Sequence, residues 1–133
     1  PGMHDVDDYP QADLIPGLLV YRYDAPLCFA NAEDFRVRAL DAVDTAASPV
    51  RWFLLNAEAN VEVDMTALEA LDQLRQECTR RGIVFAMARV KQDLRDALGA
   101  AGLLDQIGED RLFMTLPTAV EAYRAATAPD SAQ

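Results

Sequence analysis

The chain has 133 residues, a formal net charge of −10 and 51% apolar residues, which fits one globular domain with a core of its own. The excess of acidic side chains disfavours nucleic acid and anionic lipid as direct partners, because both would repel this surface. The longest apolar run, at residues 83–88, is far shorter than the ~20 residues that a membrane-spanning helix needs. We therefore expect no direct insertion of this segment into a membrane.

Residues 1–16 are expected to form an acidic leader or linker. They contain four aspartates beside glycine and proline residues, a composition that keeps a segment solvated. A role in solubility alone would account for this composition. The chain begins with Pro1 rather than methionine, so we expect it to be a piece of a longer protein.

The first elements predicted in chain order are two strands and a helix. Residues 17–23 are rich in β-forming side chains and are followed by turn residues. Residues 27–30 have the pattern of a second strand, and Asn31 is expected to cap the helix at 32–45. The short turn between the two strands predicts one antiparallel strand at an edge of the sheet.

Two nearly continuous apolar segments follow, at 50–56 and 83–88. Such runs are typical of strands covered on both faces, and we expect the first near the centre of the sheet. The helix between them is predicted to begin in a capping box of Thr66 and Glu69, or earlier at Asp64. Basic residues and a glycine mark its end.

The last part of the chain continues the alternation of helices and strands. We expect a helix, a helical extension or loop, a strand, and a final helix, at 92–101, 103–108, 112–114 and from Pro117 onward. The final helix is predicted to begin in a capping box of Thr118 and Glu121.

The complete order β-β-α-β-α-β-α-β-α predicts an α/β domain at residues 17–125, with a central, mainly parallel sheet and helices on its faces. Residues 126–133 are small and polar and are expected to be a disordered tail.

Few residues suggest catalysis or metal binding. The single histidine, His4, lies in the predicted leader, and no nucleophile elbow, phosphate loop or dinucleotide fingerprint occurs. Cys28 and Cys78 have neither metal-type spacing nor a redox-pair spacing, so we expect two reduced thiols. The sequence thus predicts a protein that is not an enzyme, with no metal site, no catalytic residue and no resident cofactor.

Polar side chains follow the predicted strands, and carboxyl ends of parallel strands form the edge where open α/β sheets bind ligands. Arg89 and Lys91 follow the strand at 83–88 and are candidates for phosphate contacts, helped by helix N–H groups. Capping alone would also explain some of the other polar residues at this edge. The predicted partner or ligand rim consists of Asn31, Asn56, Asn60, Asp64, Thr66 and Leu68.

The order of elements and several motifs resemble the STAS domain, a module shared by sulfate transporters and anti-sigma-factor antagonists. Residues 26–32 and 64–71 are most similar to the cytoplasmic carboxy-terminal domain of bacterial SulP-type sulfate or anion permeases. The motifs that carry the resemblance are Trp52–Asn56, Asp64-x-Thr66-Ala67-Leu68, the strand-ending Asn31, and Gly82-Ile83-Val84.

This resemblance implies a regulatory and protein-interaction domain at the cytoplasmic face of the plasma (inner) membrane. The implied partners are the transmembrane domain of the parent permease, a second copy, or a soluble regulatory protein. It also implies weak binding of guanine or adenine nucleotides at the rim.

The alternative within the family is a stand-alone anti-sigma-factor antagonist that acts as a partner switch. In those proteins the aspartate is followed directly by a serine that a kinase phosphorylates, and a glycine lies two places further on. Met65 and Ala67 occupy these positions here, and methionine cannot accept phosphate. Thr66 remains as the candidate phospho-switch, where phosphorylation would add roughly −1.5 to −2 charge at a helix N-terminus.

Overall fold

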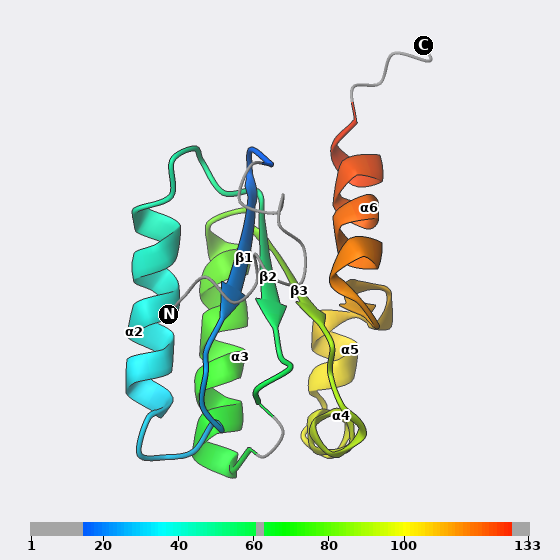
Figure 1. Ribbon diagram of the computed structural model, residues 1–133. Coiled ribbons are helices and arrows are strands. Elements are labelled where there is room, and N and C mark those ends of the chain that lie inside the picture. Colours follow the sequence, from blue (N-terminus) through cyan, green and yellow to red (C-terminus); the bar gives the residue numbers. More distant parts are fainter. Residues whose placement is uncertain (1–14, 61–62, 129–133) are drawn as a thin grey trace.

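Four parallel strands form the sheet at the centre of the molecule (Figure 1). They are β1 (Leu18–Arg22), β2 (Trp52–Asn56), β3 (Val84–Ala88) and β4 (Leu112–Phe113), in the spatial order β1-β2-β3-β4. The computed structural model describes residues 15–60 and 63–128. The predicted α/β class with a parallel sheet is confirmed, since a helix crosses over between each strand and the next.

Helices cover both faces of this sheet. On one face lie α2 (Ala32–Asp44), α3 (Met65–Arg80), α4 (Gln92–Ala100) and the short α5 (Leu103–Ile107). On the other face lies α6 (Leu116–Thr127), seen on the right in Figure 1. A 3₁₀ turn, η2 (Glu109–Arg111), leads into β4.

The burial of β2 explains why four of its five residues are apolar. All five of its residues are buried, and it pairs with β1 on one side and β3 on the other. Because side chains alternate along a strand, Phe53 and Leu55 pack in the core under α2 and α3, whereas Trp52 and Leu54 pack under α6. The prediction of a central strand covered on both faces is confirmed.

The predicted second strand at residues 27–30 is wrong, and with it the antiparallel strand at the edge. Leu27 makes only an isolated parallel bridge with Val63, and a turn follows in which the Asn31 N–H donates to the Cys28 carbonyl (3.0 Å). Leu27 is 2% exposed and belongs to the core. A single inward side chain therefore produced the strand-like pattern.

The predicted side-chain cap by Asn31 is also wrong, although the residue does stand at the N-cap position of α2. Its Oδ1 accepts a hydrogen bond from the Cys28 N–H (3.0 Å), and its Nδ2 donates to the Pro26 carbonyl (2.9 Å). The amide thus closes the preceding turn rather than the helix, a local competition that is common for asparagine.

The start of α3 is capped by the earlier of the two predicted residues. Asp64 Oδ1 accepts from the Ala67 N–H (2.9 Å), so Thr66 lies within the first turn and does not cap. In α6 the cap is Thr115, whose Oγ1 accepts from the Thr118 N–H (3.1 Å), rather than Thr118 itself. Each helix therefore begins earlier than its predicted capping box.

The first strand and the last helix are fastened together at Gly17. The Tyr123 hydroxyl donates to the Pro16 carbonyl (2.6 Å) and occupies the space that a β-carbon at position 17 would need. Gly17 also has φ +85°, a conformation that favours glycine. A side chain at this position would therefore disturb the contact between β1 and α6.

The last helix extends into the predicted C-terminal tail. Helix α6 includes residues 126 and 127 of the predicted tail, whereas residues 1–14 of the predicted leader and 129–133 of the tail lie outside the described residues. Within residues 15–60 and 63–128, every helix is too short or too polar to cross a bilayer.

Candidate functional site

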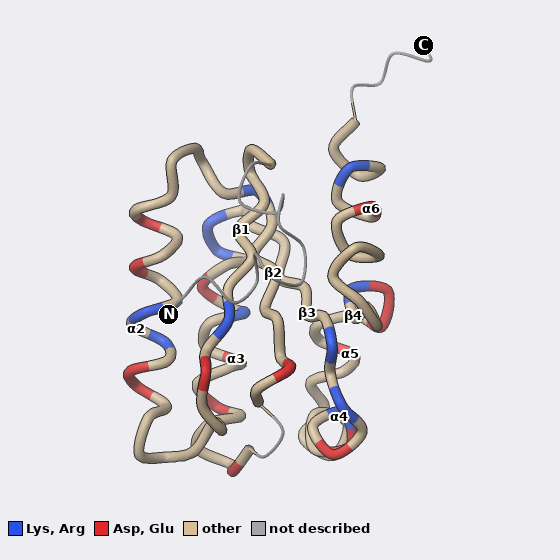
Figure 2. Tube along the Cα trace, in the orientation of Figure 1, with Lys and Arg blue, Asp and Glu red and all other residues tan. Residues whose placement is uncertain are grey.

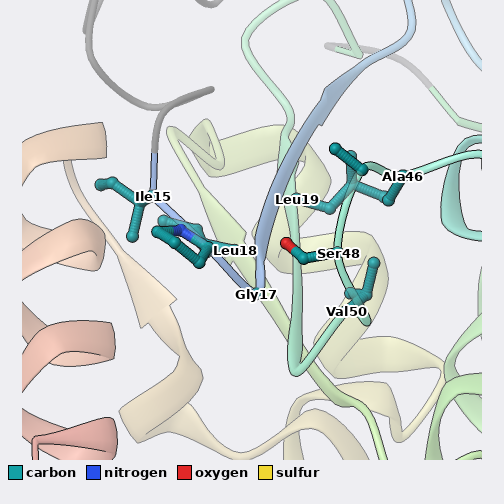
Figure 3. A pocket seen from close by; sticks show the side chains of 9 residues that line it. Ile15, Gly17, Leu18, Leu19, Ala46, Ser48 and Val50 are labelled. Atoms are coloured by element: carbon teal, nitrogen blue, oxygen red, sulfur yellow. The ribbon is translucent and has the colours of Figure 1, made fainter.

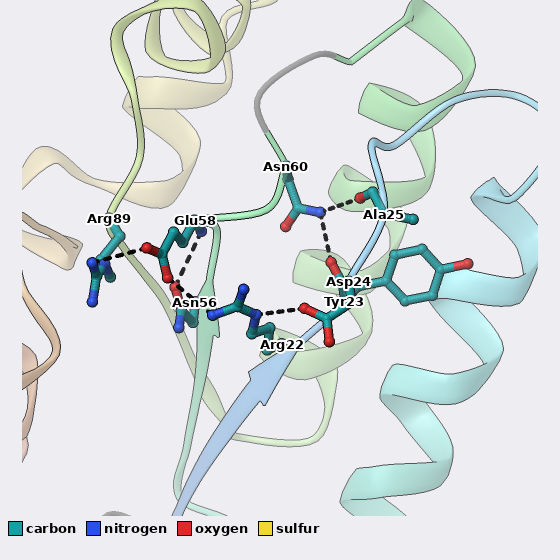
Figure 4. A network of polar contacts seen from close by, with 8 residues as sticks. All are labelled: Arg22, Tyr23, Asp24, Ala25, Asn56, Glu58, Asn60 and Arg89. Atoms are coloured by element: carbon teal, nitrogen blue, oxygen red, sulfur yellow. Dashed lines mark hydrogen bonds and ion pairs between the residues drawn. The ribbon is translucent and has the colours of Figure 1, made fainter. Parts of the chain in front are cut away.

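One carboxylate joins the carboxyl ends of three strands. Glu58 lies just after β2 and accepts from Arg22 Nη1 at the end of β1 (2.9 Å) and from Arg89 Nη2 after β3 (3.0 Å) (Figure 4). Arg22 Nε also forms an ion pair with Asp24. The side chains of Arg22, Glu58 and Arg89 are 20%, 31% and 33% exposed. Opposite charges therefore balance locally at this edge of the sheet.

The predicted phosphate contact Arg89 is thus engaged with a carboxylate. Its backbone has φ 61°, which is uncommon for a residue other than glycine, and its N–H donates to the Phe113 carbonyl (2.9 Å). Lys91 lies at the N-cap position of α4 and is exposed, without a side-chain capping bond. The structure places the two predicted phosphate contacts in different surroundings.

Asn56 and Asn60 are buried and have structural roles. Asn56 is 0% exposed and accepts from the Glu58 N–H (3.1 Å). Asn60 is 1% exposed, and its Nδ2 donates to the carbonyls of Tyr23 (3.0 Å) and Ala25 (2.7 Å) (Figure 4). The Asn60 amide joins the loop after β2 to the loop after β1, whereas Asn56 bonds within the loop after β2, so both shape the rim from below its surface.

Apolar side chains are exposed beside this polar network, at the N-terminus of α3. Met65 is 66% exposed and Phe29 is 75% exposed. The Phe29 N–H donates to Asp64 Oδ2 (2.8 Å), while Asp64 Oδ1 caps α3. Asp64 therefore uses both oxygens to hold the Phe29 loop against the helix.

An apolar groove of about 460 Å³ continues from Met65 between α3 and α4. Leu68 lines it but is only 5% exposed, so this predicted rim residue belongs mainly to the core. We call Phe29 and Met65 together with this groove the α3 surface. The groove is lined by Val63, Asp64, Met65, Leu68, Ala97, Ala100 and Ala101.

Acidic side chains flank the α3 surface. Glu69 is exposed one turn after Met65 on α3, and Asp93 and Asp96 are exposed one turn before Ala97 and Ala100 on α4. Thr66, the candidate phospho-switch, is exposed in the first turn of α3 and has no hydrogen-bond partner for its side chain among the described residues. The surface is therefore apolar at its centre and mainly acidic at its margin.

The family follows from a comparison with known proteins. Residues 9–119 match the model of the STAS domain. The chain belongs to the STAS domain family. This confirms the resemblance seen in the sequence.

A relative of this STAS domain is a probable sulfate transporter from Mycobacterium tuberculosis, which is 76% identical over 123 residues. The match covers 92% of the chain but 22% of the transporter, so the chain spans about a fifth of the length of this curated relative. The matched segment is therefore one part of a longer protein in that organism.

Two solved structures share the STAS fold. The SulP transporter STAS domain from Vibrio cholerae has a TM-score of 0.72 at 21% identity and covers 98% of this chain and 97% of its own. A putative anti-sigma factor antagonist from Thermotoga maritima has a TM-score of 0.68 at 17% identity and covers 83% and 90%. At such identities the likeness concerns the fold alone.

The shifted pKa values of this STAS domain lie away from neutrality. At the β1 edge, burial and the hydrogen bond from the Tyr23 hydroxyl to Asp34 (2.6 Å) raise the pKa of Tyr23 to about 12. That hydrogen bond, together with Arg38, lowers the pKa of Asp34. Burial raises the pKa of the free thiol of Cys78 to about 11. These shifts do not create an acid or base near pH 7.

A different hollow lies at the amino edge of β1, where the chain enters the domain (Figure 3). Its volume is about 300 Å³, and Ser48 is the one polar side chain in its lining. Specific ligand sites combine apolar walls with several polar groups that orient the ligand. No predicted site residue lies here. Among the described residues, moreover, no group of three or more His, Cys, Asp or Glu side chains is arranged to hold a metal.

Sequence reasoning missed Arg22, Glu58 and Phe29. Arg22 near the end of the predicted strand at 17–23, and Glu58 just after the predicted strand at 50–56, were usable signals for strand-end residues. Phe29 carried no such signal, because it lay inside a segment predicted as a strand. Its exposure follows from the turn that replaces this strand.

Proposed function

We propose that this STAS domain is the regulatory and protein-interaction domain of a SulP-type sulfate or anion transporter, at the cytoplasmic face of the inner membrane. The observation that carries the proposal is the 76% identity to a segment of a probable sulfate transporter. Transport itself belongs to the other parts of such a protein. The domain is not an enzyme in this proposal, and it acts through contacts.

The contact surface that we propose is the α3 surface. Exposed apolar patches with a polar margin mark interaction sites, and Met65 and Phe29 are large apolar side chains exposed at the carboxyl edge of the sheet. Cytoplasmic loops of membrane proteins carry an excess of lysine and arginine. Such loops complement both the acidic margin and the net charge of −10. The transmembrane domain of the parent transporter is therefore the partner that we propose.

A transport assay on the full-length protein from the parent reading frame tests this proposal. The double variant Phe29→Ser/Met65→Ser should lower anion uptake about tenfold, since loss of two anchors at an interface costs on the order of 1.4 kcal/mol or more. The matched control is Val37→Ser, which removes a 50% exposed apolar side chain from α2. Equal uptake by the wild type and the double variant would count against the proposal, as would a reading frame without membrane-spanning segments.

The alternative is a stand-alone partner switch with Thr66 as the phosphate acceptor. Its support is the exposed hydroxyl in the first turn of α3, where a helix N-terminus stabilises negative charge. Met65, in the place where the antagonists have the phosphorylated serine, argues for the transporter. A start codon directly upstream and phosphate on Thr66 in protein isolated from cells would favour the switch.

Weak binding of guanine or adenine nucleotides at the rim is a secondary proposal. Lys91 is its main support, because this side chain is exposed at the start of α4 and helix N-termini attract phosphate. Equilibrium titration with GDP and ATP should show weaker binding to Lys91→Ala than to the wild type. Equal affinities for the two proteins would remove the support.

A further inference from the structure

Three arginines differ from all the other arginines of the chain in their ion pairs. Among the described residues, no carboxylate forms an ion pair with Arg51, Arg111 or Arg124. Every other arginine of the chain forms at least one such pair. In a chain with a net charge of −10, unpaired guanidinium groups are a local exception.

Two of these arginines share one hollow at the amino edge of the sheet. Arg51 and Arg111 line a space of about 320 Å³ beside the starts of β2 and β3 and the end of α6. Figure 2 shows basic segments near the amino ends of β1 and β2 and towards the end of α6. The rest of the lining carries no acidic side chain; it consists of Val50, Trp52, Gly82, Val84, Ala126 and Thr127.

The guanidinium of Arg111 is held in place by an aromatic ring. Its central carbon lies over the ring of Trp52, 5.7 Å from the centroid, and Trp52 is only 6% exposed. A cation–π contact of this kind fixes the side chain and leaves its N–H donors available. Arg51 has an exposed side chain, and its backbone N–H is bonded to the Gly17 carbonyl (2.7 Å).

A favourable position at the carbonyl end of a helix explains the unpaired Arg124, but neither Arg51 nor Arg111. Arg124 lies in the last turn of α6, where a basic side chain favourably faces the carbonyl end of the helix. Arg51 precedes β2 and belongs to no helix, and Arg111 ends a 3₁₀ turn whose next residue begins β4. The nearby acids are also placed elsewhere: Glu109 pairs with Arg95, and Asp110 is exposed outside the lining of the hollow.

We propose that this arginine hollow, formed by Arg51, Arg111 and Trp52, binds a tetrahedral oxyanion, a sulfate or phosphate group. Guanidinium forks bind such oxygens in pairs, and the hollow has the size of a small-ligand site. The site lies at the opposite edge of the sheet from the α3 surface and is independent of the proposed function. A free anion and a lipid headgroup are two sources of the same chemistry.

The test is an NMR titration of the chain with sodium sulfate and with inorganic phosphate, against sodium chloride at equal ionic strength. We expect saturable shifts of the Trp52 indole and of the Gly82 and Val84 amides that chloride does not cause. Arg51→Ala should bind at least about tenfold more weakly, the loss of roughly one charge-assisted contact. Arg36→Ala is the matched control, because Arg36 is paired with Glu33 and lies outside the hollow.

Folding and ligand source are checked separately. Arg51→Lys keeps the charge but loses the planar fork, so it should bind more weakly than the wild type while its spectrum stays folded. Sedimentation with phosphatidylcholine vesicles, with and without phosphatidylglycerol, identifies the source. Arg51-dependent binding to soluble anions assigns a free anion, and Arg51-dependent binding to the anionic vesicles alone assigns a headgroup. Shifts that are equal in chloride or unchanged in Arg51→Ala, together with vesicle binding that does not depend on Arg51, would overturn the proposal.

Discussion

The two edges of the sheet differ in how their arginine side chains are paired. At the carboxyl edge, Glu58 pairs with both Arg22 and Arg89, and Asp24 also pairs with Arg22. The exposed features next to this network are the apolar Phe29 and Met65. At the amino edge, Arg51 and Arg111 form no ion pair with a carboxylate among the described residues. The contrast shows that one sheet can offer a surface suited to a protein at one edge and a site suited to a small anion at the other.

The largest effect is expected where the loops of the carboxyl edge are held together. Asn60→Ala removes the donor to the Tyr23 and Ala25 carbonyls and should lower the free energy of unfolding by about 2 kcal/mol, because buried polar groups lose their partner. Urea denaturation measures this change. Gln76→Ala, which removes an amide from an exposed position, is the matched control. A loss no greater than that of the control would mean that the rim does not depend on this buried amide.

A smaller loss is expected at the start of α3. Asp64→Ala removes the acceptor for the N–H groups of Ala67 and Phe29, which should cost about 1 kcal/mol. Thr66→Ala should cost much less, since Thr66 does not cap. Comparing the two variants by thermal denaturation separates the two possible caps of α3. Equal losses would contradict the assigned role of Asp64.

A still smaller loss of stability is expected from weakening the ion pairs at the carboxyl edge. Glu58→Gln weakens the ion pairs to Arg22 and Arg89 and should cost about 0.5 to 1 kcal/mol, because the three side chains are partly exposed. Arg51→Ala at the opposite edge should leave the free energy of unfolding nearly unchanged. Urea midpoints at low salt measure both. If Arg51→Ala were the more destabilising change, the arginine at the amino edge would have a structural role instead.

The smallest expected effect depends on pH. Hydrogen bonds from Arg80 and Arg81 lower the pKa of Glu77 from 4.5 to about 2. Between these two values the unfolded chain binds the proton more readily than the folded one, so the stabilisation is complete above pH 4.5 and is lost as the pH falls towards 2. Glu77→Gln should therefore reduce the difference between the urea midpoints at pH 7 and pH 3. Glu69→Gln, at an exposed position on the same helix, is the matched control.

Residues with a strong local pattern were predictable from sequence. The strand Trp52–Asn56 and the helix that begins after Asp64 follow from apolar periodicity and capping, and both are present. The strand at residues 27–30 was mispredicted because Leu27 reaches the core from a turn, and a local pattern does not distinguish a turn from a strand. The bridge by Glu58 depends on where β1 and β3 end beside β2, which is tertiary information.

The same distinction applies to the candidate site. The family motif identified the carboxyl edge through Asp64, Thr66 and Leu68, but not which side chains are exposed there. Leu68 is turned towards the core, whereas Met65 is exposed. The groove arises from the distance between α3 and α4, which the sequence of either helix does not determine.

The most direct test of the central claim is site-specific photo-crosslinking in the full-length protein. A photoreactive residue is placed at position 65 of the α3 surface or, as a control, at position 37 of α2, and the crosslinked peptides are identified by mass spectrometry. The account predicts crosslinks from position 65, and not from position 37, to lysine- or arginine-rich cytoplasmic loops of the membrane part. The account would be contradicted if position 65 gave no crosslinks, or gave them only to a second copy of the domain or to a soluble protein.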